Sequence, residues 1–196
     1  MPPAPEDAYG RTKLAAEELV REAQREGLHA PILRLPLVYG PGVKGNLWRL
    51  LGAISRGWPM PFAGVPNRRS LAALENVVAA IDSVLEAPAA ANGTYFVSDD
   101  HDVSSAQLCE ALAEGIGRSV RLVPAPVGLL YLAGRLGDLL QTVSLPAPLR
   151  TEQVRRLLGS LQVSPARLRA ETGWAPVVDP QSALAATGHW FRSHAR

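Results

Sequence analysis

Two residues near the N-terminus have the types and spacing needed for proton transfer. Tyr9 and Lys13 lie four positions apart in AYGRTKLAAEELVREAQRE, a segment rich in helix formers, so their side chains leave one helix face a turn apart. A nearby ammonium group favours the phenolate form of a tyrosine. Such a tyrosine can take the proton of a substrate hydroxyl while hydride leaves the same carbon. The same spacing also occurs on solvated helices that do no chemistry.

The elements predicted along the chain, which position this pair, alternate between helix and strand. The helix predicted over 8–26 ends at Gly27, and the apolar run 31–39, PILRLPLVY, predicts a buried parallel strand with a kink at Pro36. Further strands are predicted over 70–74, 94–98 and 119–123, a loop over 58–67, and helices over 46–57, 75–86, 104–115, from about 127, and over 151–158, 165–172 and 180 onward. This alternation indicates an α/β architecture.

Capping residues predict where three of these helices begin. Asn46 is a plausible N-cap, Ser104 with Gln107 forms a capping box, and Asp179 caps a helix that has Pro180 in its first turn. These residue types satisfy backbone N–H groups that have no partner within a helix.

The composition of the chain excludes several classes of protein. Its 196 residues allow one large or two small domains, and 47% hydrophobic with 19% charged residues excludes a disordered, collagenous or coiled-coil protein. Twenty basic residues against eighteen acidic ones leave a net charge of +2, with no run of five Lys or Arg, so no nucleic-acid partner is expected.

The cysteine content and the apolar stretches predict a cytoplasmic chain without a membrane span. Cys109 is the single cysteine, so no internal disulfide can form, and the first residues contain no apolar signal core. We expect Cys109 to be a small buried residue rather than a nucleophile. The stretch 127–145 is too short and too polar to span a bilayer, and it is typical of a buried or dimer-facing helix.

Two motifs imitate binding sites. Gly40, Gly42 and Gly45 spell G-x-G-x-x-G between a predicted strand and a predicted helix, but Pro41 removes a backbone N–H and no acidic residue follows a second strand. We therefore interpret this segment as a turn. The acidic run 99–102, DDHD, has no second ligand cluster, so we predict a solvated turn and no metal site.

Four segments carry a resemblance to a known family. YGRTKLAAE followed by LRLPLVYGPG resembles the catalytic helix and next strand of extended short-chain dehydrogenases/reductases. NRRSLAALENVVAAI, TYFVSDDHDVSSAQL and RAETGWAP resemble later family segments in the same order, from residue 9 to residue 176 overall. Within this family the sequence is most similar to the NAD-dependent epimerase/dehydratase branch, and to bacterial UDP-sugar or N-acetylhexosamine 4-epimerase-like proteins of polysaccharide synthesis.

The resemblance implies roles for residues at the cofactor. Tyr9 would be the acid/base, and Lys13 would hold the ribose hydroxyls of NAD or NADP and favour the phenolate. Pro36 and Val38 would border the nicotinamide.

The resemblance also implies contacts to a nucleotide-sugar substrate. Asn46 and Leu47 match positions that contact the nucleotide-sugar, and Arg69 matches an arginine that binds its diphosphate, which a planar guanidinium suits. Arg69 is alternatively a surface charge paired with Glu75 or Asp82. Arg68 is its alternative in register. Arg155 or Arg156 is a candidate for a second cationic contact, but the resemblance is loose there and favours a solvated helix face for both.

The expected architecture is the C-terminal portion of a Rossmann-like doubly wound sheet plus a small α/β substrate-binding subdomain. Residues 1–45 would be a remnant of the dinucleotide-binding domain, and 46–196 would mostly form the subdomain, with about 66–100 returning to the sheet. The family's N-terminal glycine-rich half is missing from this sequence. We therefore expect the chain to be incomplete for catalysis and to bind the dinucleotide weakly or not at all.

Two functions stay open at this point. The first is an NAD(P)-dependent nucleotide-sugar 4-epimerase-like protein that acts by tyrosine-assisted transient oxidation of the sugar. The second is a non-catalytic remnant that serves as a nucleotide-sugar-binding or dimerisation module. In either case we expect a homodimer formed through the helix over 8–26. The particular sugar, the choice between NAD and NADP, and epimerase against reductase or dehydratase activity stay open.

Overall fold

The computed structural model describes residues 5, 7–90, 92–124, 126–142 and 151–195. In chain order the elements are α1 (Ala8–Arg25), β1 (Ile32–Arg34), β2 (Leu37–Tyr39), α2 (Gly45–Ser55), β3 (Met60–Ala63), β4 (Arg69–Ala73), α3 (Leu74–Glu86), a 3-10 turn (Pro88–Ala90), β5 (Thr94–Phe96), β6 (Asp102–Val103), α4 (Ser105–Ile116), β7 (Leu122–Pro124), α5 (Val127–Thr142), α6 (Thr151–Leu158), α7 (Ala166–Thr172) and α8 (Pro180–His194). The predicted α/β class is confirmed.

Strand pairing is mostly parallel and joins segments that are distant in the sequence. Strand β1 pairs with β5, with Ile32 opposite Thr94, and β2 pairs with β4, with Leu37 opposite Leu71. Strand β3 pairs with β7, and these three pairs are all parallel. The short β6 runs antiparallel to β4.

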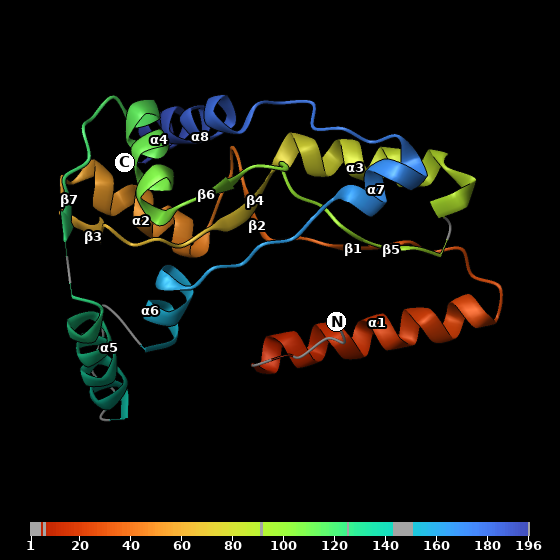
Figure 1. Cartoon of the computed structure of the whole chain (residues 1–196), viewed down its shortest axis with the longest axis horizontal. Helices are drawn as coiled ribbons and strands as arrows, with labels where there is room; N and C mark the ends of the chain where they lie inside the picture. The colour runs from red at the N-terminus through yellow and green to blue at the C-terminus, as the bar shows by residue number, and fades with distance from the viewer. Residues whose placement is uncertain (1–4, 6, 91, 125, 143–150, 196) are drawn as a thin grey trace.

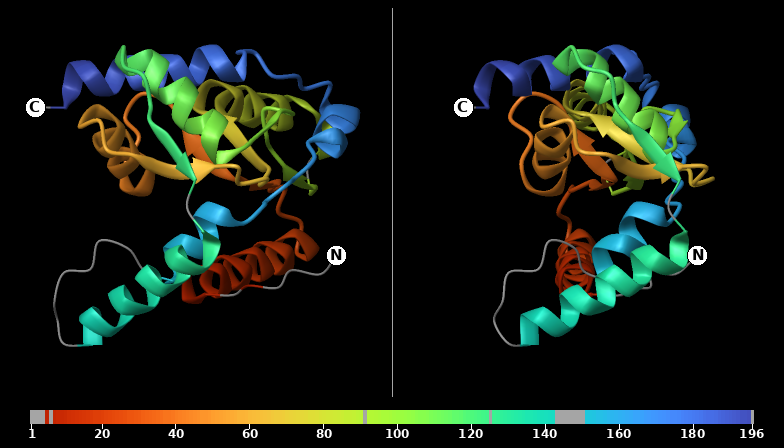
Figure 2. Two further views of the ribbon diagram at one scale, coloured as in Figure 1. Left: turned by 60° about the vertical axis from the view of Figure 1, so that its left-hand side comes forward. Right: turned by 90° about the vertical axis from the view of Figure 1, so that its left-hand side faces the viewer.

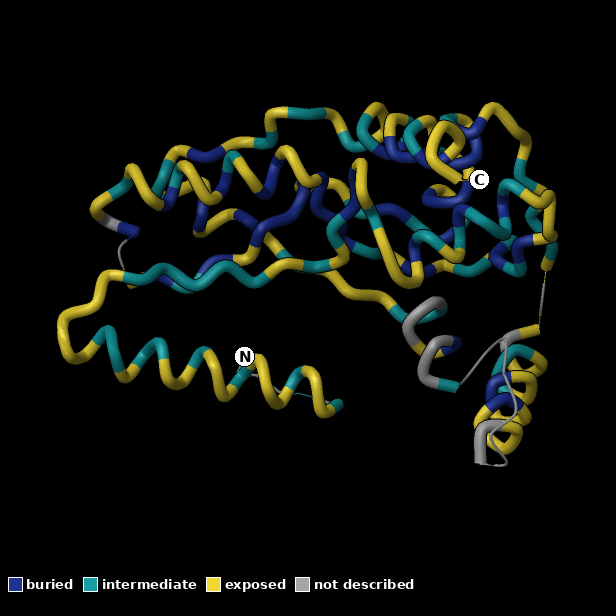
Figure 3. The backbone as a smooth tube through the Cα atoms, turned by 180° about the vertical axis from the view of Figure 1, so that it is seen from behind, coloured by how far each residue is buried: buried dark blue, intermediate teal, exposed yellow. Residues whose placement is uncertain are grey.

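The strands form a layer with helices on both sides. Helices α3, α4 and α8 cover one face, whereas α1, α5 and α6 lie beyond the other (Figures 1 and 2). Buried residues concentrate around the strands and the first set of helices, and α1 shows only intermediate and exposed positions (Figure 3). The core therefore belongs to the body formed by the strands with α2, α3, α4, α7 and α8.

The core consists of two apolar clusters. The first lies among β2, α2, β3, β4, α4 and α8, and its fully buried members include Leu51, Leu112 and Leu184. The second joins α3, β5 and α7, and it is centred on Tyr95 and Leu168.

A buried carboxylate lies where these clusters meet. Asp99 is 5% exposed, and its oxygens accept hydrogen bonds from the Tyr39 hydroxyl at 2.7 Å, the Ala73 N–H at 2.8 Å and the Asn76 amide at 2.7 Å. These donors come from β2, from the end of β4 and from the first turn of α3. The prediction of a solvated turn over 99–102 is therefore wrong at Asp99, because only Asp100 and His101 are exposed.

Asn76 extends this network to the segment between α7 and α8. Its side-chain oxygen accepts the N–H groups of Val177 at 2.8 Å and Val178 at 3.0 Å, and its backbone oxygen accepts the Trp174 indole N–H at 3.3 Å. Asn76 is fully buried. One asparagine therefore fixes a segment about one hundred residues further along the chain to the start of α3.

The strand expected over 31–39 is two strands. Leu35 and Pro36 separate β1 from β2, because proline has no N–H to donate to a ladder. The break lets the chain leave the pairing with β5 and join β4.

Several other boundaries differ from the sequence expectation. Helix α2 begins at Gly45 with Lys44 as its N-cap, so Asn46 lies inside the first turn rather than at the cap. The segment expected as loop contains β3, and the strand expected over 119–123 lies at 122–124. Both errors concern short strands, β3 and β7, which pair with each other. The sequence around each strand does not reveal this pairing.

The predicted helix starts at Ser104 and Asp179 are confirmed. Ser104 and Gln107 form the capping box, and Asp179 accepts from the Ser182 N–H with Pro180 at the helix start. Burial raises the pKa of the Cys109 thiol to about 12, in agreement with its predicted role as a small core residue. Among the residues that the structure describes, no helix is long and apolar enough to cross a bilayer.

The Asp99 network predicts a large loss of stability on substitution. Asp99→Ala removes the shared acceptor of three buried donors and leaves Tyr39 and Asn76 only their longer bonds to the backbone oxygens of Pro180 and Val178, at 3.3 and 3.4 Å, so we expect the free energy of unfolding to fall by about 3 kcal/mol in urea denaturation. Asp82→Ala removes an exposed carboxylate from α3 and should change it by about 0.5 kcal/mol at most. Equal small effects of both substitutions would contradict the role assigned to Asp99.

Candidate active site

Helix α1 places the Tyr9–Lys13 pair at one end of the sheet. Its N-cap, Asp7, accepts the Gly10 N–H at 2.6 Å, which starts the helix just before Tyr9. Helix α1 runs opposite to β1, so its first turn lies on the side of the carboxyl ends of β1 and β5 (Figure 1). That is the side on which open α/β sheets bind ligands.

The pair itself is close and open to solvent. The Lys13 ammonium nitrogen lies 5.6 Å from the centre of the Tyr9 ring, and Tyr9 is 70% exposed. The structure thus confirms the shared face expected from the four-residue spacing.

Two other tyrosines are held as neutral phenols. Burial, with a hydrogen bond to Asp99, raises the pKa of Tyr39 well above its ordinary value. Burial also raises the pKa of Tyr95 to about 12, and its hydroxyl donates to Glu171. Neither can be deprotonated readily near neutral pH, whereas Tyr9 is accessible to a ligand.

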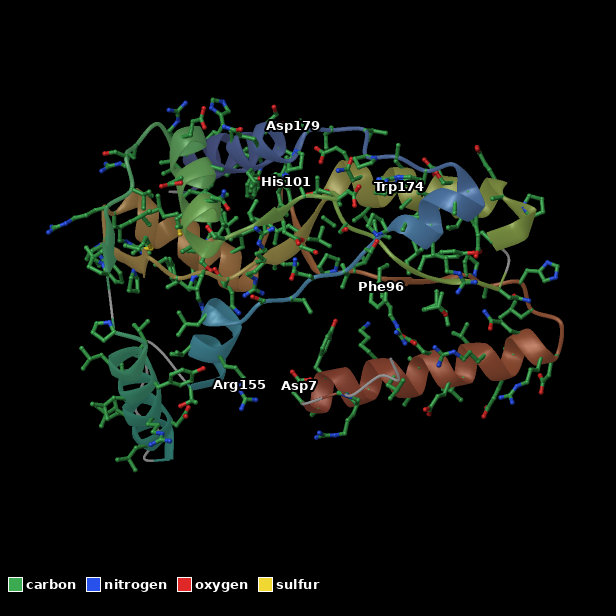
Figure 4. The ribbon with its side chains drawn as sticks, viewed as in Figure 1. Asp7, Phe96, His101, Arg155, Trp174 and Asp179 are labelled. Carbon is green, nitrogen blue, oxygen red and sulfur yellow. The ribbon has the colours of Figure 1, made fainter. Side chains whose placement is uncertain are left out.

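Charged contacts fasten α1 to the sheet. The Arg34 guanidinium donates two hydrogen bonds to the Glu17 carboxylate, at 2.9 and 2.7 Å, and Arg21 donates another at 2.8 Å. Arg34 also lies 5.6 Å from the centre of the Phe96 ring, which lies on the α1 side of β5 (Figure 4). The hydrogen bonds from Arg34 are the main cause that lowers the pKa of Glu17. Sequence reasoning missed this contact because Glu17 and Arg34 lie 17 positions apart and carry no local motif.

Of the predicted nicotinamide neighbours, Pro36 lies at the break between β1 and β2, whereas Val38 lies within β2 and packs against the second core cluster. Pro36 and Val38 are half-buried, and the flanking Leu35 and Leu37 are exposed at 45% and 36%. Apolar side chains therefore follow directly beyond the carboxyl end of β1.

The predicted substrate residues lie on two further elements. Arg69 begins β4, two positions before Leu71, and its backbone forms a bridge with Leu161. Arg69 is half-buried, whereas its alternative in register, Arg68, is exposed.

Asn46 and Leu47 lie in the first turn of α2. Asn46 is exposed, but Leu47 is 2% exposed and its side chain belongs to the first core cluster. Leu47 can therefore offer a ligand its backbone only. Arg155 lies on α6, near the N-terminal end of α1 where Asp7 lies (Figure 4). The Arg156 side chain is outside the described part of the structure.

A surface hollow elsewhere includes none of the predicted residues. It lies between α4 and α8 and is lined by Glu114, Gly115, Ala185, Ala186, His189, Trp190, Arg192 and Ser193. Among the side chains that the structure describes, no cluster of His, Cys, Asp and Glu could hold a metal ion.

Comparison with known proteins gives consistent matches over the chain. Residues 1–97 match the model of the NAD dependent epimerase/dehydratase family. The chain is 35% identical over 190 residues to a UDP-glucose 4-epimerase from Vibrio cholerae, covering 96% of this chain and 55% of the relative. It is 27% identical over 146 residues to an N-acetyl-alpha-D-glucosaminyl-diphospho-ditrans,octacis-undecaprenol 4-epimerase from Escherichia coli O157:H7, covering 73% of this chain and 44% of that relative.

Solved structures share the fold. A UDP-glucose 4-epimerase from Thermus thermophilus, in complex with NAD, matches with a TM-score of 0.69 and 23% identity, covering 99% of this chain and 57% of that chain. RMD from Pseudomonas aeruginosa, complexed with NADPH, matches with a TM-score of 0.70 and 21% identity, covering 99% and 58%. The predicted Rossmann-like architecture is thereby confirmed. The chain spans about half the length of the curated relatives it matches.

The Glu17–Arg34 contact predicts how α1 responds to substitution and to pH. Because the pKa of Glu17 is lowered in the folded chain, its contribution is present above the ordinary value of 4.5 and is lost as the pH falls through the folded value. Glu17→Gln should therefore speed hydrogen exchange of the α1 amides at pH 7, and the difference from the parent chain should disappear in acid.

The neighbouring Glu18→Gln is the matched control, because Glu18 is exposed on the same turn. We expect it to leave α1 exchange unchanged. Equal acceleration of exchange by both substitutions would show that α1 is stabilised by its overall charge rather than by the contact between Glu17 and Arg34.

Proposed function

Because the chain belongs to the NAD-dependent epimerase/dehydratase family, we propose that it forms the acid/base and sugar-binding portion of a nucleotide-sugar 4-epimerase. The observation that carries this proposal is the Tyr9–Lys13 pair, 5.6 Å from ring centre to ammonium, at the carboxyl side of β1 and β5. The curated relatives from Vibrio cholerae and Escherichia coli are both 4-epimerases by name, which supports this reaction class over a reductase or dehydratase.

Tyr9 would move the proton. Its phenol oxygen would take the proton from O4 of the hexose, and the Lys13 ammonium, close to the same ring, would favour that transfer. After the sugar has presented its other face, Tyr9 returns the proton to the same oxygen. The exposure of Tyr9 supports this role, because a substrate hydroxyl can reach it.

The predicted cofactor residues are chemically suited to a nicotinamide dinucleotide. Lys13 carries donors for ribose hydroxyls, and Pro36 and Val38 offer half-buried apolar surface for a planar ring. A bound NAD or NADP would supply the reversible hydride acceptor that oxidation at the sugar carbon requires. We expect the chain by itself to bind the dinucleotide weakly, since the family's glycine-rich pyrophosphate turn has no counterpart in this sequence.

The substrate would extend from Tyr9 toward β4 and α2. The Arg69 guanidinium suits the two phosphates of a nucleotide-sugar, such as a UDP-hexose or UDP-N-acetylhexosamine. Asn46 offers an exposed amide, and Leu47 its backbone N–H in the first turn of α2. Arg155 on α6 is a candidate for a second cationic contact.

We propose the same division of the chain that the sequence predicts. Residues 1–45 would belong to the dinucleotide-binding domain and 46–196 mostly to the sugar-binding subdomain, with about 66–100 returning to the sheet. The pairing of β4 with β2 and of β5 with β1 supports this division. The single cysteine supports a reducing, cytoplasmic location.

A second candidate function is a non-catalytic dimerisation module built on α1. None of the α1 residues is buried, and Leu19 is 67% exposed on this helix. A homodimer through 8–26 would cover that surface.

The catalytic proposal predicts which substitutions remove activity. The chain would be mixed with the part of the Vibrio cholerae relative that it does not match, and formation of UDP-galactose from UDP-glucose measured with NAD present. We expect Tyr9→Phe to lower the rate by roughly 10²–10⁴ without weakening UDP-glucose binding in calorimetry. Lys13→Met should also slow the reaction, whereas Arg11→Met, which removes a charge from the same helix, should not.

An unchanged rate with Tyr9→Phe would contradict the role of Tyr9. Turnover by the unmixed chain, together with micromolar NAD affinity, would contradict the expectation that it is incomplete for catalysis.

The dimerisation module predicts self-association through α1. In sedimentation equilibrium the chain should dimerise, and Leu19→Ser should weaken the dimer about tenfold by removing apolar burial. Leu85→Ser, which changes an equally exposed leucine on α3, is the control. A monomer at high concentration would count against the module.

A further inference from the structure

The Arg34 side chain joins helix α1 to two strands. Its guanidinium, on β1, donates two hydrogen bonds to the Glu17 carboxylate of α1, at 2.9 and 2.7 Å. The guanidinium carbon also lies 5.6 Å from the centre of the Phe96 ring on β5 (Figure 4). The side chains of Arg34 and Glu17 are only 24% and 16% exposed, so water competes little for their hydrogen bonds. Arg34 therefore connects α1 to both strands of the β1–β5 pair.

Glu17 stands in a fixed relation to the proposed acid/base. Tyr9, Lys13 and Glu17 follow one another at four-residue steps on α1, so each side chain lies one turn from the next. At a rise of 1.5 Å per residue, Tyr9 lies about 12 Å from Glu17 along the helix axis. A hydrogen-bonded helix is stiff over this length. A contact that fixes Glu17 therefore fixes Tyr9 as well.

Arg34 stands in a similar relation to the predicted nicotinamide neighbours. Pro36 follows it by two residues and Val38 by four, which is at most about 13 Å of extended chain. Because α1 runs opposite to β1, these residues and Tyr9 lie in the same direction from the Glu17–Arg34 contact (Figure 1). This one contact thus determines how far along the strands Tyr9 lies.

Apolar packing does not fix α1, because no residue described in this helix is buried. At its C-terminal end the Gln24 amide donates to the Ala30 carbonyl oxygen at 2.6 Å, within the turn that leads to β1. A helix held at that end alone can still change its direction, and the displacement is largest at the end that carries Tyr9. The paired hydrogen bonds between Arg34 and Glu17 lie nearer to Tyr9 and have a defined geometry, so they remove this freedom.

We propose that Arg34 is a positioning residue of the epimerase reaction, which fixes α1 along β1 through Glu17 and so places the Tyr9 oxygen for proton transfer. The proposal rests on the proposed function, because it requires Tyr9 to be the acid/base. Arg34 acts through Glu17 and not on the substrate. A displacement of about 1 Å in a reacting group can lower a rate about a hundredfold, so the geometry of the contact matters as well as its charge.

Arg34→Lys tests this geometry, because lysine keeps the positive charge and lacks the planar fork. In the mixed assay with the unmatched part of the Vibrio cholerae relative, we expect kcat to fall roughly 10–100-fold while KM for UDP-glucose stays within about twofold. Arg21→Lys is the matched control. Arg21 donates to the same Glu17 carboxylate at 2.8 Å, but it belongs to α1 and does not connect this helix to a strand. It should leave kcat unchanged.

A distance measurement tests the same point without activity. Spin labels would be attached through Arg11→Cys on α1 and Asp82→Cys on α3, which are exposed positions, whereas the native Cys109 is buried. In double electron–electron resonance we expect one narrow distribution of distances, and the same distribution when Arg21→Lys is added. Arg34→Lys should broaden or shift it. Circular dichroism would establish that every variant is folded.

The outcomes separate this proposal from the proposed function. An unchanged distance distribution with Arg34→Lys would overturn the positioning role whatever the assay shows. Parent-like kcat, a change in KM alone, or equal losses of kcat in the two lysine variants would overturn it too. If the parent chain does not turn over in the mixed assay, or Tyr9→Phe turns over equally well, the proposed function fails. The distances then still decide whether Arg34 fixes the position of α1.

Discussion

The buried carboxylate of Asp99 is the interaction on which the arrangement of this chain depends. It joins β2 through Tyr39, β4 through the backbone of Ala73, and α3 through Asn76, which in turn holds the segment before α8. A buried charge is tolerated only where donors surround it, so these elements can occupy a single relative arrangement. Because β2 and β4 also flank the predicted ligand-binding side, the same network determines where Pro36, Val38 and Arg69 lie.

Helix α1, which carries Tyr9 and Lys13, is attached in a different way. Whereas the body is held by two apolar clusters, α1 has no buried residue and meets the sheet through Glu17 and Arg34. Ion pairs fix direction well but contribute little to stability when they are partly exposed. The position of Tyr9 and Lys13 relative to the strands is thus set mainly by polar contacts.

Sequence reasoning succeeded where the signal is local and failed where it is not. The helix starts at Ser104 and Asp179 and the shared face of Tyr9 and Lys13 follow from capping chemistry and helical spacing, and the structure confirms them. The burial of Asp99 could not be predicted, because an acidic run is typical of a solvated turn and its buried partners, Tyr39 and Asn76, lie far away in the sequence. Likewise, Leu47 matches a ligand-contact position of the resembled family, but its side chain is in the core. A short strand such as β3 forms because it pairs with β7, and the residues of β3 by themselves give no sign of that pairing.

The parallel pairing of β1 with β5 also has a kinetic consequence. Ile32 must find Thr94, and the backbone of Arg69 must find Leu161, across long intervening stretches of chain. High contact order of this kind slows folding, since the entropy of closing long loops is lost before the pairs form. During synthesis the edge of β1 that pairs with β5 stays open until β5 has emerged, and an open strand edge of this kind favours aggregation.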